Sequence, residues 1–177
     1  MKQPKNKTEI HYLYENHKTM EQNQCIANRL REVFLNGTWI ANTNYKKELE
    51  STTYKQAIQK VGNLNTIAVL TYHINYYLSG LLKVLNGGPL DISDKYSFDA
   101  PVLQTDAEWK ALVAKLLENA EAFSQAVAQL PHATLNTPFV NEKYGTYNRN
   151  LEGVIEHSYY HLGQIVLIKK LVGDSAV

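Results

Sequence analysis

The sequence contains little cysteine and no long apolar run, and each absence narrows the class of protein. Cys25 is the only cysteine among 177 residues, so an internal disulfide is excluded. A lone thiol is typical of the reducing cytoplasm, where we expect the protein to act. No stretch of about 18 residues or more, the length needed to cross a bilayer, is continuously apolar. The first residues also lack the apolar core of a secretory signal.

An excess of charge of one sign is missing as well. The chain carries 18 basic and 17 acidic side chains, for a formal net charge of +1. Nucleic acids and anionic membrane surfaces select basic proteins, so neither is expected as a partner. Apolar residues make up 44% of the 177 residues, which suffices for one domain with a real core.

Helical periodicity dominates the chain and predicts an all-α fold, a four-helix bundle. Four segments repeat apolar residues at the spacing of a buried helix face, with capping residues before them and Gly or Pro after them. They are 19–36, opened by Thr19, then 65–86, 105–130, and a last helix that starts near Asn148 or Asn150 and ends at 172. Shorter helices are expected within 45–61 and a short hairpin within 137–147.

The ends of the chain and one connection complete this expected organisation. Residues 1–18 are polar and are expected to form a flexible N-terminal segment, which leaves 19–177 as the bundle domain. The connection 87–104 is long and contains Gly and Pro. Fully extended it reaches roughly 60 Å, whereas a helix over 65–86 is about 33 Å long. The connection can therefore cross the length of the bundle and leave the second and third helices parallel.

A pair of histidines in the last helix carries the most chemical information. His157 and His161 lie four residues apart and share one face of that helix. His73 lies in the 65–86 helix, which contains no Asp or Glu. A buried imidazole needs partners for its nitrogens, and one metal ion would satisfy all three rings. The residues alone leave two interpretations open: a shared metal ion, or separate histidines that are hydrogen-bonded in the core.

The type of ligand narrows the chemistry of such a site. Three neutral histidines suit Zn, Ni, Fe or Cu better than Mg or Ca. Three protein ligands leave one position open to water or a thiolate, as in catalytic sites. The metalloprotease motif is excluded because Ser158 stands where it needs Glu. A ferritin-like site needs Glu three residues before its histidine, where this chain has Val154 and Ser158.

Polar residues beside these histidines are candidates for a pocket. Asn75 and Tyr76 follow His73 closely, and Tyr160 precedes His161. We expect Asn75, Tyr76 and Tyr160 to line a pocket next to the metal. The remaining histidines lie in polar or loop segments and are expected to be solvated: His11, His17 and His132.

The stretches around the three histidines resemble the DinB/YfiT-like superfamily of metalloenzymes. The resemblance covers residues 20–173 and rests on 70–77 (LTYHINYY) and 156–165 (EHSYYHLGQI). By position, it implies that His73, His157 and His161 bind one divalent metal, most often zinc or nickel. It also implies an up-down-down-up bundle, which agrees with the long crossover, and a homodimer.

The resemblance further suggests a function. Characterised members of the superfamily are thiol-dependent enzymes, among them bacillithiol and mycothiol S-transferases and a mycothiol-dependent maleylpyruvate isomerase. We therefore expect a metal-dependent thiol S-transferase or hydrolase that acts on a small-molecule substrate, with a low-molecular-weight thiol as cofactor. The alternative is a non-catalytic dimeric bundle that acts as an interaction or small-ligand-binding module. The absence of an obvious general acid or base beside the histidines in the sequence favours this alternative.

Overall fold

The fold is all-helical, with irregular connections and no strand, over residues 21–173, the part of the chain described by a computed structural model. Within that range it has six α-helices: α2 (Gln22–Arg31), α3 (Tyr45–Glu50), α4 (Tyr54–Ile58), α5 (Ile67–Leu85), α6 (Asp106–Gln129) and α7 (Tyr147–Val172). A π-helical turn, η1 (Glu32–Asn36), continues α2, and the 3-10 turns are η2 (Asp94–Tyr96), η3 (His132–Asn136) and η4 (Glu142–Tyr144). The prediction of an all-α fold is confirmed for these residues.

Some expectations fall outside the described residues. They are the flexible segment 1–18, the capping residue Thr19 and the last four residues of the expected domain. Within the described range, α2 begins at Gln22, and Glu21 occupies its N-cap position without a side-chain hydrogen bond. No helix within residues 21–173 is both long and apolar enough to span a membrane.

Threonine side chains set where the long helices begin. Thr105 and Glu108 form the predicted capping box at the start of α6. Thr66 caps α5 by accepting a hydrogen bond from a backbone amide in its first turn. α7 begins at Tyr147, next to the expected Asn148, but the expected capping residue is wrong, because Thr146 caps this helix in place of an asparagine. The Asn150 side chain instead donates to two backbone carbonyls before and at the cap, both at 2.8 Å.

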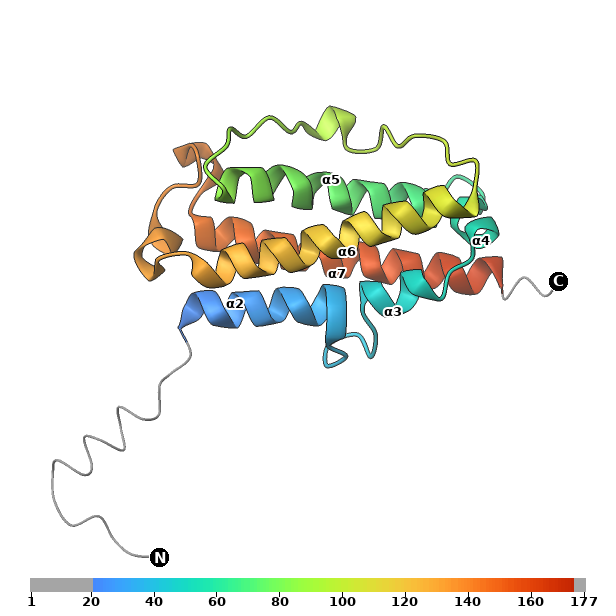
Figure 1. Cartoon of the computed structure of the whole chain (residues 1–177), viewed down its shortest axis with the longest axis horizontal. Helices are drawn as coiled ribbons and strands as arrows, with labels where there is room; N and C mark the ends of the chain where they lie inside the picture. The colour runs from blue at the N-terminus through green and yellow to red at the C-terminus, as the bar shows by residue number, and fades with distance from the viewer. Residues whose placement is uncertain (1–20, 174–177) are drawn as a thin grey trace, which may run out of the picture.

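Four helices, α2, α5, α6 and α7, pack around one apolar core (Figure 1). α6 lies against both α5 and α2, while α7 packs against α5 and α2. Large buried side chains come from each side of this core: Phe34, Ile74, Trp109, Phe123 and Ile155. The core therefore holds α5 and α7 next to each other, which are the two helices that carry the histidines of interest.

The connection 86–105 returns along α5 before α6 begins (Figure 1). Its close approach requires Gly80 on α5, because a Cβ at that position would clash with the Ile92 side chain of the connection. The middle of the connection contains η2 and lies over the part of α5 that carries His73. An irregular segment thus covers the face of α5 beside the histidines.

The predicted hairpin is reduced to a single antiparallel bridge between Pro138 and Thr146. The Phe139 amide donates to the Gly145 carbonyl at 2.8 Å, and the buried Phe139 ring packs edge-on against Tyr147 with centroids 5.0 Å apart. This small loop closes one end of the bundle and contributes a wall to the cavity described below.

Polar contacts fix the rotation of α7 about its own axis. The buried Tyr45 hydroxyl of α3 donates to the Ser158 carbonyl at 2.9 Å. Further along the helix, the Lys169 ammonium pairs with the Glu48 carboxylate at 3.0 Å, with both side chains largely shielded from solvent. These anchors lie on either side of His161 in the sequence, so the histidine face of α7 is held toward α5.

Candidate metal centre

Three histidines from two helices meet at the junction of α5 and α7. His73 comes from α5, and His157 and His161 come from successive turns of α7. One ring nitrogen of each lies within 4.8 Å of the other two. His73 and His161 are buried, at 4% and 5% exposed, and His157 is half-buried. The structure thus brings together the three residues that the sequence singled out.

The Nε2 atoms of the three rings converge on one another. His157 Nε2 lies 2.8 Å from His161 Nε2 and 3.2 Å from His73 Nε2. The rings meet edge-on, with the His157 and His161 centroids 4.5 Å apart. Three ring nitrogens therefore point into one small volume, which is the arrangement that three ligands of a single ion require.

Partners on the far side of two rings determine where their protons lie. His73 Nδ1 is 3.2 Å from the Ser97 carbonyl, and His161 Nδ1 is 2.7 Å from Gln164 Oε1. Both partner oxygens can only accept, so each Nδ1 carries the proton and each opposite Nε2 presents a lone pair. When all three rings are neutral, only His157 Nε2 can donate a hydrogen bond, and it can donate to only one of the other two Nε2 atoms. A cation between the three nitrogens satisfies all the lone pairs, so these residues fit a divalent metal ion.

Aromatic rings hold His73 in this orientation. Phe98, from the connection, stacks on the His73 ring with centroids 3.9 Å apart and an interplanar angle of 11°. Tyr77, one turn further along α5, meets the same ring edge-on at 5.1 Å and the His157 ring at 5.5 Å. These contacts limit the rotation of the imidazoles and keep their Nε2 atoms aimed inward.

Burial keeps all three imidazoles neutral, which is the form that binds metal. Desolvation is the main cause, and it lowers the pKa of His73, His157 and His161. The effect is largest for His157, where desolvation and the charges of the other two histidines lower the pKa from 6.5 to about 4. Because the site disfavours protonated rings, the ring nitrogens keep the lone pairs with which they can bind a metal cation.

One carboxylate lies close to this cluster. The Tyr77 hydroxyl donates to Asp94 Oδ1 at 2.6 Å, and burial together with this bond raises the pKa of Tyr77 to about 12. Asp94 belongs to η2 in the connection, and its charge acts on both His73 and His157. The sequence did not single out Asp94, Ser97 or Phe98, because an irregular connection has no periodicity that would predict which residues face the site.

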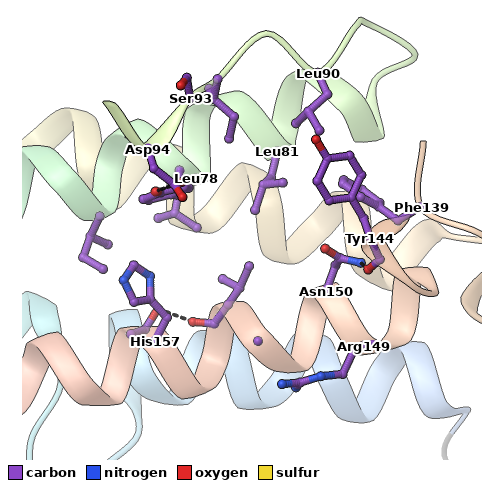
Figure 2. Close-up of a pocket in the computed structure, with 16 residues that line it drawn as sticks. Leu78, Leu81, Leu90, Ser93, Asp94, Phe139, Tyr144, Arg149, Asn150 and His157 are labelled. Atoms are coloured by element: carbon purple, nitrogen blue, oxygen red, sulfur yellow. Dashed lines mark hydrogen bonds between the residues drawn. The ribbon is translucent and has the colours of Figure 1, made fainter. Parts of the chain in front are cut away.

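A cavity of about 640 Å³ opens beside His157, between α5, the connection and α7 (Figure 2). Figure 2 shows His157 rising from α7 toward Asp94, with Leu90 and Tyr144 at the opposite end. Seven of the 16 lining residues have apolar side chains, and eight carry polar groups: Tyr77, Ser93, Asp94, Tyr144, Arg149, Asn150, His157 and Ser158. The volume is in the range of pockets that hold small organic molecules.

The three residues expected to line a pocket beside the metal do not line this cavity. Asn75 accepts a hydrogen bond from the Asn119 side chain at 2.8 Å and so faces α6. Tyr76 bonds through its hydroxyl to the Ser93 backbone, which anchors the connection. Tyr160 is 64% exposed and touches His161 only from the outside, with ring centroids 4.9 Å apart. Tyr160 directly precedes His161 and so points about 100° away from it, and Asn75, two residues after His73, points to nearly the opposite side of α5. Tyr76 lies only about 60° around the helix from His73, but its hydroxyl bonds hold it at the connection.

The one further histidine among the described residues takes no part in the cluster. His132 is exposed in the turn η3. His11 and His17 lie outside the described residues. Glu156, which precedes His157, pairs with Arg149 at 3.0 Å on the exposed side of α7.

The pKa of His157 predicts how the stability of the metal-free protein depends on pH. Between pH 6.5 and about 4 the unfolded chain binds a proton at His157 and the folded protein does not. The stabilising contribution is therefore complete above pH 6.5 and is lost as the pH falls through this window. We expect the thermal unfolding midpoint, measured by circular dichroism, to fall more steeply in wild type than in His157→Gln. Equal slopes would contradict the described burial; His132→Gln serves as the surface control.

The three-histidine cluster lies within a part of the chain that matches a known family. The model of the DinB superfamily matches residues 41–165, a range that contains all three histidines. No curated protein and no solved structure matched the chain. Members of this superfamily are generally associated with a metal ion, in agreement with the three-histidine cluster. Because the match extends over well more than half of the sequence, the chain belongs to the DinB superfamily.

Proposed function

We propose that the protein is a metal-dependent enzyme in which His73, His157 and His161 bind one divalent ion, zinc or nickel. The observation that carries this proposal is the convergence of three Nε2 atoms, two of which must present lone pairs. Imidazole ligands without a carboxylate favour these metals over Mg or Ca. We propose thiol S-transfer or hydrolysis as the reaction, with a low-molecular-weight thiol as cofactor; the thiol-dependent enzymes of the superfamily support this choice.

His73, His157 and His161 would hold the ion, and the rest of the cavity supplies position and proton acceptance. A divalent ion bound there would lower the pKa of a bound water or thiol. Asp94 is the only carboxylate among the residues that line the cavity. Its Oδ1 accepts from Tyr77, which leaves Oδ2 to accept the proton that a substrate thiol or water releases.

The alternative, a non-catalytic dimeric bundle, rested on the lack of a general base near the histidines. Asp94 weakens that argument because it lies in the same cavity as His157. The metal content of the protein, described below, separates the two functions.

We further propose an up-down-down-up order for α2, α5, α6 and α7, and a homodimer. The course of the connection 86–105 along α5 supports the order. An apolar stripe on α7 supports the dimer: Tyr160, Leu167 and Leu171 are 64%, 55% and 56% exposed and follow one another along one face. A cytoplasmic site of action is supported by the single cysteine.

Metal content tests the proposal directly. Protein purified without a histidine tag is expected to bind one zinc or nickel ion per chain, measured by elemental analysis after equilibration with the metal. His73→Ala, His157→Ala and His161→Ala should each lose stoichiometric binding, and His132→Ala should retain it. The metal should also raise the unfolding midpoint of wild type by mass action. Absence of both effects in wild type would support the non-catalytic bundle.

The partner of His161 Nδ1 should tune metal affinity without holding the fold together. In Gln164→Ala, nothing fixes the tautomer or the ring plane of His161, and loss of such a partner typically weakens metal binding about 10- to 100-fold. Competition against a chromophoric chelator measures the affinity. Gln125→Ala, on the exposed face of α6, is the matched control. Unchanged affinity in Gln164→Ala would show that His161 does not bind the ion through Nε2.

The dimer proposal makes a separate prediction. Leu167→Glu places a charge in the middle of the exposed stripe on α7 and should shift the protein toward monomer in sedimentation velocity. Glu118→Gln, on the exposed face of α6, is the control and should keep the wild-type distribution. A monomeric wild type at micromolar concentration would contradict the dimer.

A further inference from the structure

The cavity beside His157 has room for a small molecule, and apolar side chains form part of its walls. Its volume is about 640 Å³, and it reaches from His157 to the loop that closes the end of the bundle (Figure 2). The apolar side chains that line it come from α5, the connection, the loop and α7: Ile74, Leu78, Leu81, Leu90, Ile92, Phe139 and Val154. Such walls gain free energy by covering an apolar surface and gain little from a polar one.

The charged groups of the lining leave no cation directed into this space. Arg149 is the only basic residue of the lining, and Figure 2 shows its guanidinium turned away from the cavity. It pairs there with Glu156 at 3.0 Å. Asp94 is the only acid and lies at the histidine end, bonded to Tyr77. A negative charge carried by the body of a ligand would therefore enter the cavity unpaired.

Gly153 occupies a position on α7 where a glycine has no structural purpose. It lies four residues before His157, on the same face of the helix, and lines the cavity. Glycine weakens a helix interior. No neighbour explains it, since a Cβ added at Gly153 meets nothing within 4 Å. The missing side chain leaves open the part of the cavity next to His157.

We propose that the cavity binds a molecule with a neutral, apolar body whose single metal-binding group lies at the His157 end, and that Gly153 determines how large this body can be. This inference rests on the proposed function, because it names the class of substrate that the metal centre would act on. The body fills the space between α5 and α7, and the connection covers it from above.

A pair of variants on α7 tests whether the apolar body lies beside Gly153. Gly153→Leu fills the cavity, whereas Gly163→Leu, also on α7, adds the same side chain at an exposed site with no neighbour within 4 Å. Binding of N-phenyl-1-naphthylamine, a neutral apolar probe, is followed by its fluorescence on metal-free protein. We expect at least tenfold weaker binding in Gly153→Leu and wild-type binding in Gly163→Leu. Equal affinities in the two variants would overturn the inference.

A pair of probes tests whether the body of the bound molecule must be neutral. 8-Anilino-1-naphthalenesulfonate has the same rings with an added sulfonate, and metal-free wild type should bind it at least tenfold more weakly at the site that Gly153→Leu blocks. Equal or tighter binding of the sulfonate there would contradict a neutral body. If Gly153→Leu does not fold, Gly153→Ala decides: it should weaken probe binding relative to Gly163→Ala, and equal binding counts against the inference.

The same proteins separate this inference from the metal proposal. Zinc affinity should be unchanged in Gly153→Leu, because the substitution adds volume beside His157 and removes no ligand. Wild type that binds the neutral probe but no metal would refute the proposed metal centre and leave the cavity assignment standing on the probe data. If wild type binds metal but Gly153→Leu and Gly163→Leu bind the neutral probe with equal affinity, only the cavity assignment is refuted.

Discussion

Three imidazole Nε2 atoms converge with too few hydrogen-bond donors among them, and the rest of the site depends on this constraint. Ser97 and Gln164 hold the protons of His73 and His161 on the outer nitrogens, so two lone pairs face His157 Nε2 across 3.2 and 2.8 Å. Protonation would supply the missing charge, but desolvation opposes it and lowers all three pKa values. A divalent cation would satisfy the three nitrogens together, and its binding energy would add to the stability of the fold.

The irregular connection 86–105 does much more than join two helices. It contributes the carbonyl that orients His73, the Phe98 ring that stacks on it, and the only carboxylate of the cavity lining, Asp94. It reaches these positions because Gly80 allows Ile92 to approach α5 closely. The helices therefore supply the candidate ligands, whereas the connection orients His73 and brings a carboxylate to the same cavity. A rigid scaffold with functional groups on a connecting segment is a common division of roles.

The meeting of His73 with the other two histidines was expected from the resemblance to the DinB/YfiT-like superfamily, because the residues alone left separate core histidines equally open. Periodicity and capping chemistry predicted the helices and the shared face of His157 and His161, because both depend on local spacing. The i and i+4 positions of His157 and His161 and the capping box at Thr105 are features of this kind. Asn75, Tyr76 and Tyr160 were expected at the pocket from proximity in sequence, but their directions depend on packing against α6, the connection and solvent. Asp94 and Gln164 acquire their roles only through contacts formed in three dimensions, which one sequence does not encode as a pattern.

The identity and number of the metal's ligands is the central claim, and X-ray absorption at the zinc or nickel edge measures it most directly. We expect a nearest shell of nitrogen and oxygen scatterers, with three imidazole nitrogens about 2.0–2.1 Å from zinc and the outer-ring scattering of histidine. His73→Ala protein, loaded to the same occupancy where it still binds, should show one imidazole fewer. A nearest shell containing fewer than three imidazoles in wild type, or sulfur from Cys25, would contradict the account.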